Sequence, residues 1–269
     1  MDIVNAQVVI KALEKKTYAA PGVTCHPELS MSQNGETAYY YKRSASSVGE
    51  GKVGDKHTYT AKGHTLENIN MVDSITIDAV MPAAQCELVN GIDPVSDKVA
   101  QESLTAANKY NEKFVAALEK ETAGETLTAA VSADNVYNVI LQAIKNYKIK
   151  NKATGVRPTG ILVSPATMAA LREKNLLEFK DALPGGSEMV DGYFSKLPVI
   201  ECVDMDSKVE FILVNAEGFA APQNLKVLTV ADATAAGYPG GKIIAGEVGY
   251  GFKVTESNLI YKVAAKTGA

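Results

Sequence analysis

A long polar segment between two strand-like stretches constrains this chain more than any other feature. The triple tyrosine at 39–41 and residues 74–80 have the aromatic or β-branched composition of strands. Residues 42–72 between them are polar and carry glycines at positions 49, 51, 54 and 63. Connections longer than about 12–15 residues without their own structure are uncommon inside a compact domain. We therefore expect this segment to reach outside its own domain.

An extended hairpin is the structure that the segment favours, with disorder as the alternative. Apolar and polar residues alternate in 57–60 and again near 66–71, as is typical of strands. A two-stranded ribbon this polar is only marginally stable by itself. The hairpin interpretation therefore requires a surface elsewhere on which the ribbon can lie.

Helical periodicity predicts amphipathic helices at residues 2–16, 94–121 and 132–148. Pro94 suits the first position of the long helix behind Asp93 as N-cap, and Gly124 is expected to end it. The apolar face of the first helix comprises Ile3, Ala6, Val9, Ile10 and Leu13. That of the long helix comprises Val95, Val99, Ser103, Ala106, Tyr110, Phe114 and Ala117, widened by Leu104, Ala107, Val115 and Leu118. That of the third comprises Val136, Ile140, Ile144 and Tyr147, widened by Val139 and Ala143.

The second half of the chain has an α/β pattern. Ile161-Leu162-Val163 reads as a buried strand, and Ser164-Pro165 as the start of a helix that buries Met168 and Leu171. Residues 180–195 read as a loop. Strands are predicted at 198–203, 209–214, 225–230, 243–248, 250–255 and 259–263, the last two joined as a hairpin by residues 256–258. Residues 18–36, with an Asn34-Gly35 turn signal and no periodicity, are expected to form an extended arm.

Charge and cysteine content exclude several classes of protein. The formal net charge is −4, whereas a dedicated nucleic-acid binder needs a basic excess for phosphate contacts. A protein that only encloses nucleic acid has no such need. Residues 1–5 lack the pattern of a secretory signal, and no apolar stretch approaches the roughly 18 residues of a membrane span. Cys25, Cys86 and Cys202 lie far apart, which indicates free thiols in a reducing cytoplasm.

No motif predicts catalysis, a cofactor or a metal. All three histidines fall in the arm or the polar segment, where no rigid scaffold would hold them. Cys25-His26 is the only adjacent pair of thiol and imidazole in the sequence. A structural zinc site needs four ligands, usually in close pairs, so zinc is a poor fit. The glycines of residues 246–251 are interpreted as close packing of a strand, and those of residues 184–187 as part of a surface loop. Asp204 and Asp206 are interpreted as residues of a solvated turn. We therefore expect a protein that is not an enzyme.

The order of the elements resembles the Hong Kong 97 fold of tailed-bacteriophage major capsid proteins. Residues 75–78, leading through Ile92-Asp93 into the long helix, are similar to that family's join between extended loop and spine helix. Residues 159–171 resemble its strand-then-helix signature, and residues 197–200 and 211–215 follow in the expected sequence. The resemblance covers nearly the whole chain.

The resemblance implies an α+β capsid fold divided into four parts. Residues 1–41 would form the N-terminal helix and arm, and residues 42–72 the extended loop. Residues 73–155 and 242–269 would form a peripheral domain with the long spine helix, and residues 156–241 an axial α/β domain. If the resemblance holds, the first helix would leave no room for the fused scaffolding segment of some relatives, and a separate scaffold or none would guide assembly.

The resemblance also implies residues that contact other subunits. The extended loop would lie across a neighbouring subunit, with contacts from Val48, Lys52, Val53, Lys56, Tyr59, Lys62 and Leu66. Tyr238 and Pro239 are candidates for a loop near the five- and six-fold axes. Some relatives carry covalent cross-links, for which Lys52, Lys56 and Lys62 are candidates, with solvated charges as the alternative.

The implied function is a structural subunit that assembles into the icosahedral shell of a virion in the host bacterial cytoplasm. Its partners would be other copies in pentamers and hexamers, with a scaffolding, portal or decoration protein as further candidates. The shell would enclose DNA without sequence-specific binding, and it needs neither a cofactor nor a membrane. The alternatives are an encapsulin-like bacterial compartment whose N-terminal helix helps to form a cargo groove, a phage tail or other particle protein, and an unrelated α/β enzyme.

Overall fold

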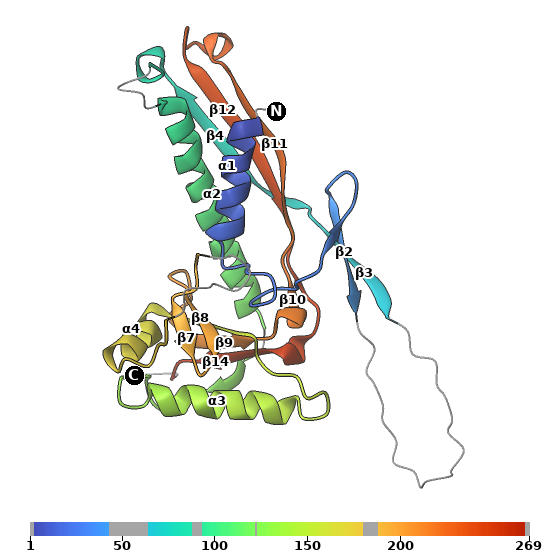
Figure 1. Ribbon diagram of the computed structural model, residues 1–269, viewed down its shortest axis with the longest axis vertical. Coiled ribbons are helices and arrows are strands. Elements are labelled where there is room, and N and C mark those ends of the chain that lie inside the picture. Colours follow the sequence, from blue (N-terminus) through green and yellow to red (C-terminus); the bar gives the residue numbers. More distant parts are fainter. Residues whose placement is uncertain (1–2, 43–63, 88–92, 122, 180–187, 267–269) are drawn as a thin grey trace, which may run out of the picture.

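The computed structural model describes residues 3–42, 64–87, 93–121, 123–179 and 188–266. The protein is an elongated body with a tall three-stranded sheet at one end and a six-stranded sheet at the other (Figure 1). Two helices run along the tall sheet, and a narrow ribbon projects sideways from the middle of the body (Figure 1). Helices and sheets mix along the chain, as the predicted α+β class requires.

The tall sheet has the strand order β11-β12-β4, and both of its pairings are antiparallel. Its strands are β4 (Asp73–Met81), β11 (Gln223–Asp232) and β12 (Lys242–Tyr250). Ile75 and Ile77 are buried, whereas Thr76 between them is exposed. Successive side chains of a strand point to opposite faces, so this alternation shows that one face of the sheet is covered and the other is open.

Two helices cover the buried face of the tall sheet. α2 (Pro94–Glu119) packs on β4 and β12, and α1 (Ile3–Lys15) packs on α2 and β11. α2 begins where the sequence predicts, because the Asp93 carboxylate accepts a hydrogen bond of 3.0 Å from the backbone N–H of Val95. The predicted spine helix and N-terminal helix are both confirmed as helices.

The predicted faces of these helices are wrong at two positions. Ile10 and Leu104 are exposed. α1 buries the stripe of Ala6, Val9 and Leu13, and Ile10 lies about 100° around the helix from Val9. On α2 the buried stripe passes through Ser103 and Ala107, which leaves Leu104 beyond its edge.

The predicted role of Gly124 is also wrong. α2 ends at Glu119, and Gly124 belongs to a short strand, β5 (Ala123–Thr126). A Cβ atom on Gly124 would lie 2.5 Å from the ring of Tyr261, so the glycine permits a close approach of strand and ring.

The six-stranded sheet has the order β5-β14-β9-β6-β8-β7. Besides β5, its strands are β6 (Gly160–Val163), β7 (Gly192–Phe194), β8 (Leu197–Glu201), β9 (Val209–Val214) and β14 (Ile260–Ala264). α3 (Val136–Lys150) and α4 (Pro165–Glu173) pack on β9. The predicted cap of α4 is confirmed, since the Ser164 hydroxyl accepts a 3.2 Å hydrogen bond from the N–H of Thr167. Two boundaries differ from prediction: α3 begins at Val136, and β7 lies inside the predicted loop.

The predicted hairpin of the last two strands is wrong. β12 runs on to Tyr250, and the short β13 (Lys253–Val254) pairs with β10 (Phe219–Ala220). β14 instead pairs antiparallel with β9 and parallel with β5. Ser257–Leu259 forms a turn of 3-10 helix between β13 and β14, which leads the chain from the β10-β13 pair into the six-stranded sheet. A short polar turn between apolar stretches indicates a hairpin, but it does not reveal which sheet edges are free.

The sheets divide the chain differently from the predicted domains. β11 lies within residues 156–241, yet it pairs along its length with β12 of the tall sheet. α3 and β14 fall within residues 73–155 and 242–269, the ranges predicted for the domain of the spine helix, but they belong to the six-stranded layer. The reason for the first difference is the turn at 237–241, which folds β12 directly back onto β11.

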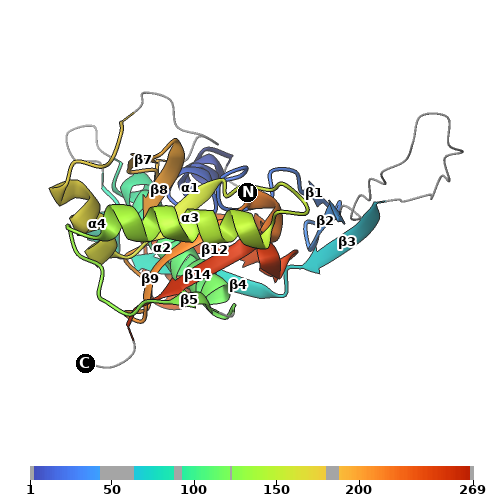
Figure 2. The same cartoon turned by 90° about the horizontal axis from the view of Figure 1, so that it is seen from below.

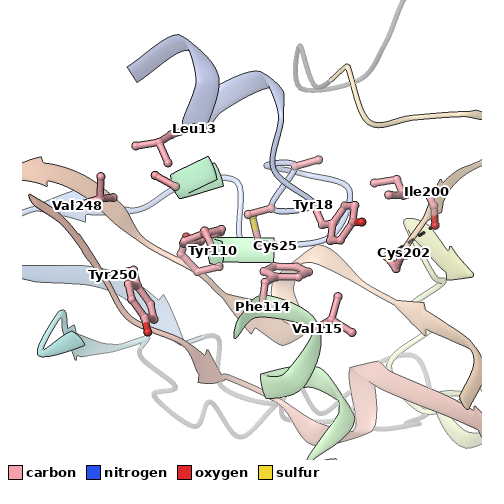
Figure 3. Close-up of a cluster of buried hydrophobic side chains, with 14 of the residues drawn as sticks. Leu13, Tyr18, Cys25, Tyr110, Phe114, Val115, Ile200, Cys202, Val248 and Tyr250 are labelled. Atoms are coloured by element: carbon pink, nitrogen blue, oxygen red, sulfur yellow. Dashed lines mark hydrogen bonds between the residues drawn. The ribbon is translucent and has the colours of Figure 1, made fainter. Parts of the chain in front are cut away.

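The predicted arm is irregular but packed. Tyr18, Ala20, Val23 and Cys25 are buried, and the N–H of Tyr18 donates a 2.8 Å hydrogen bond to Oδ1 of Asn111 in α2. Figure 3 shows Tyr18 and Cys25 beside Tyr110 and Phe114 of α2, with Val248 and Tyr250 of β12 nearby. The arm therefore completes the core at the junction of the two sheets. Only its end forms a strand, β1 (Ser30–Met31).

Candidate assembly surface

The projecting ribbon is an antiparallel pair of strands. β2 (Thr37–Lys42) pairs with β3 (Thr65–Asn70), in a register that runs from Thr37 opposite Asn70 to Lys42 opposite Thr65. β1 pairs with the other edge of β2 through the predicted turn at Asn34-Gly35, where Gly35 has a φ of 66°. The strands predicted at the triple tyrosine and near 66–71 are confirmed and run antiparallel, whereas the alternating residues 57–60 lie outside the described residues.

The ribbon has one buried and one exposed face at its base. Tyr40 and Ile69 face the body and pack with Ala220 of β10. Tyr41 and Leu66 are opposite each other in register on the other face, and they are 64% and 55% exposed. Two neighbouring apolar side chains this exposed form a surface that gains stability from a covering partner.

A cluster of polar groups holds the ribbon to the body. The Tyr40 hydroxyl and Nζ of Lys253 each donate a 2.8 Å hydrogen bond to Oε2 of Glu67. Lys253 also donates to the backbone carbonyl of Asn68 at 3.2 Å, and Nζ of Lys42 lies 3.6 Å from Oε1 of Glu67. The hydrogen bond from Lys253, followed by that from Tyr40, lowers the pKa of Glu67 to about 2. Glu67 is therefore an ionised anchor between β3 and β13.

Replacing the anchor carboxylate gives a pH-dependent prediction. A group whose pKa is depressed by folding stabilises the fold above its unfolded pKa and loses that effect as the pH falls through its folded pKa. The free energy of unfolding should be about 1 kcal/mol larger for wild type than for Glu67→Gln at neutral pH, because the variant loses the charged hydrogen bonds. The difference stays this small because those hydrogen bonds are partly exposed to solvent. This difference should shrink as the pH falls from 4.5 towards 2.

Urea denaturation of the unassembled protein across this pH range measures the effect. Glu28→Gln, an exposed carboxylate of the adjoining arm, is the control and should track wild type throughout. A difference between wild type and Glu67→Gln that stays constant down to pH 2 would contradict the role of the ionised carboxylate.

Most of the predicted contact residues of the extended loop lie outside the described residues. These are Val48, Lys52, Val53, Lys56, Tyr59 and Lys62. Leu66 lies on the exposed face of β3. Tyr41 beside it was not among the predicted contacts, although alternation along the triple tyrosine carries the signal: Tyr40 is turned inward, so its neighbours are turned outward.

Tyr238 and Pro239, the candidates for a loop near the five- and six-fold axes, belong to the tall sheet and not to the six-stranded layer. Their place near an axis stays a prediction. They form the turn between β11 and β12, at the far tip of the tall sheet (Figure 1). Gly237 and Gly240 flank them with φ angles of 87° and 73°, which favour glycine and close the hairpin. The pair is exposed there.

The described residues offer little chemistry. They contain no group of three or more His, Cys, Asp or Glu side chains arranged to hold a metal ion. Cys25 and Cys202 are free but buried, and burial raises the pKa of Cys25 to about 12, which disfavours the reactive thiolate. Gly246 in β12 packs against Leu228, as expected for a glycine in a close-packed strand.

Helices that could span a membrane are not found within the described ranges.

Comparison with known proteins identifies relatives by structure but not by sequence. No protein-family model matches the chain, and no curated protein matches it. The capsid structure of the cyanophage P-SCSP1u is 14% identical, with a TM-score of 0.58, over 89% of this chain and 85% of that one. The bacteriophage PhiM1 mature capsid is 9% identical, with a TM-score of 0.58, over 94% and 88%. A virus-like particle from Pyrococcus furiosus is 8% identical, with a TM-score of 0.56, over 97% of each chain.

At these identities the likeness establishes the fold. The mixed helix and sheet architecture matches that of the solved phage capsid structures, as the sequence resemblance predicted. The match spans nearly all of this chain and most of each of these relatives.

Proposed function

We propose that this protein is a structural shell subunit that self-assembles, through many copies of itself, into the icosahedral capsid of a bacteriophage. The observation that carries the proposal is the ribbon, which leaves the body and exposes Tyr41 and Leu66 side by side. A ribbon of this kind gains its missing contacts when residues 42–72 lie across a neighbouring copy. The capsid fold of the structural relatives supports the same function.

The two sheets suggest how the subunit is divided in the shell. The tall sheet with α1 and α2 fits the peripheral domain of the Hong Kong 97 fold. The six-stranded layer with α3 and α4 fits the axial domain. Tyr238 and Pro239, at the tip of the tall sheet, are then contacts of the peripheral domain. Contacts between unlike surfaces of identical copies close into rings, which accounts for pentamers and hexamers.

The remaining parts of the proposal concern the particle. The shell encloses DNA without reading its sequence and forms in the host bacterial cytoplasm before it becomes part of the virion. Its partners are neighbouring subunits, and a separate scaffolding, portal or decoration protein acts where the particle requires one. The subunit itself is not an enzyme and needs no cofactor.

Expression of the protein alone, followed by negative-stain electron microscopy and sedimentation velocity, tests the proposal. We expect closed shells, or rings of five and six subunits, once the protein concentration is high enough. A protein that stays monomeric at high concentration, both alone and with the other proteins of its source, would count decisively against a shell.

An encapsulin-like bacterial compartment is the second candidate. It is favoured by α1, a helix at the start of the chain that packs on α2 and β11, where it can border a cargo groove. The similarity to a virus-like particle, with coverage of 97% in both directions, supports a shell and is compatible with either candidate. Particles that copurify with a cargo enzyme favour the compartment, and particles that contain nucleic acid favour the capsid.

A further inference from the structure

The outward face of α3 carries an unusual combination of exposed lysines and an exposed isoleucine. α3 lies across the end of the molecule, and its outer side is not covered by any other element (Figure 2). Lys145 and Lys148 are exposed along it, and Ile149 beside them is 61% exposed. Residues 145–157 contain four lysines, one arginine and no carboxylate. This face has no covering partner within the described residues.

The fold of the single chain does not account for this face. The helix dipole favours cations in the last turn of a helix, which explains Lys148 and Lys150. Lys145 lies one turn further back, and like charges three or four residues apart destabilise a helix slightly. Ile149 gains nothing from exposure to water. A partner with carboxylates around an apolar group would compensate for both features.

The same chain presents such a surface elsewhere. A groove between α2 and the turn after β8 is bordered by Glu112, Asp204 and Val203, and Val203 is 68% exposed. Other carboxylates of the groove already have partners: Glu188 pairs with Lys15 and Lys16, and Asp191 and Glu201 pair with Arg172. Glu112 and Asp204 make no ion pair with the described residues. Partial burial, and then the nearby Glu112, raise the pKa of Asp204, as expected for a carboxylate without a neighbouring cation.

We propose that the outward face of α3 docks into this groove on a second copy of the chain, with Lys145 and Lys148 against Glu112 and Asp204, and Ile149 against Val203. The inference rests on the proposed function and adds to it a contact between subunits that does not involve the ribbon. Because the two surfaces differ, the contact is heterologous and propagates from copy to copy around a ring.

The exposed isoleucine favours a protein partner over nucleic acid. Contacts to phosphate use cations and polar groups, and they leave an apolar side chain in water. Protein interfaces bury apolar groups at their centre and place charges around them. The matched pair of Ile149 and Val203 fits the second arrangement.

A charge swap tests the contact. Lys145→Glu with Lys148→Glu should place like charges across the interface, and so should Glu112→Lys with Asp204→Lys. Each double variant should raise the protein concentration needed for assembly by about tenfold or more, because juxtaposed like charges are strongly unfavourable at an interface. The combination of all four substitutions restores opposite charges and should recover most of the assembly. Sedimentation velocity gives the assembled fraction, and thermal melts show that each variant is folded.

Controls separate this contact from general charge effects and from the shell itself. Lys109→Glu with Lys113→Glu changes the net charge by the same amount at exposed positions of α2. This control should not reproduce the loss of assembly, and adding it to Glu112→Lys with Asp204→Lys should not restore assembly. The neutral pairs Lys145→Gln with Lys148→Gln, and Glu112→Gln with Asp204→Asn, serve if a reversal variant does not fold. If wild type forms no shell, a mixture of the two double variants still tests the contact. One variant keeps the native groove and the other keeps the native face of α3, so the two proteins should associate with each other.

Three outcomes would overturn the proposal. The quadruple variant could remain as impaired as the doubles, or the doubles could assemble like wild type. Alternatively, assembly could be unchanged while Lys145→Glu with Lys148→Glu loses salt-dependent binding of non-specific double-stranded DNA, which would assign the face to nucleic acid.

Discussion

Replacing residues 43–64 with an Asn-Gly turn is expected to abolish particle formation and to leave the monomer folded. Lys42 and Thr65 are paired in register, so a two-residue turn closes the strands at that point without moving them. The anchor of Tyr40, Glu67 and Lys253 stays in place. In the proposed shell the replaced residues cover the neighbouring subunit, and a contact repeated in every copy cannot be lost without loss of the shell.

The measurement combines electron microscopy with a thermal melt of the unassembled protein. Tyr41→Ser with Leu66→Ser is the graded companion, because it removes only the exposed apolar pair and should weaken assembly rather than abolish it. Asn34-Gly35, the other turn of this small sheet, supplies the control: two residues inserted there should leave assembly intact. A shortened protein that still forms shells of normal size would refute the proposed role of the ribbon.

Phe114→Ala is expected to cost about 3–5 kcal/mol of folding free energy, the range for large aromatic residues in a core. Phe114 is fully buried, and its ring centroid lies 5.3 Å from that of Phe219 and 6.0 Å from that of Phe252. These rings join α2 to the strands that link the two sheets. A loss of this size is a large share of the roughly 5–15 kcal/mol that keeps a domain folded, so the yield of particles should fall as well.

Urea denaturation of unassembled protein measures this cost. Leu104→Ala removes an apolar side chain from the exposed side of the same helix, and it should change stability by no more than about 0.5 kcal/mol. Phe114→Leu fills most of the space and should cost clearly less than Phe114→Ala. Equal effects of Phe114→Ala and Leu104→Ala would contradict the packing described for α2.

Part of the assembly surface was predictable from the sequence. The length and polarity of residues 42–72 indicated a ribbon that reaches outward, and its described strands lie at the triple tyrosine and near 66–71 as the pattern predicts. The Glu67 anchor was not predictable, because Lys253 lies far along the chain and reaches Glu67 only through the pairing of β13 with β10. The groove at Glu112 and Asp204 escaped prediction for the same reason, and Asp204 alone reads as a solvated turn.

The sequence by itself determined the local elements: the Asp93 and Ser164 caps, the buried stripes of α2 and α3, and the strand at 209–214. These depend on residues within a few positions of one another, where periodicity and capping act. Only the tertiary structure decided that β11 joins β12, that β14 joins β9, and that the arm enters the core. Any apolar strand can satisfy its backbone hydrogen bonds with several others, so the choice depends on which faces are buried together once the whole chain has packed.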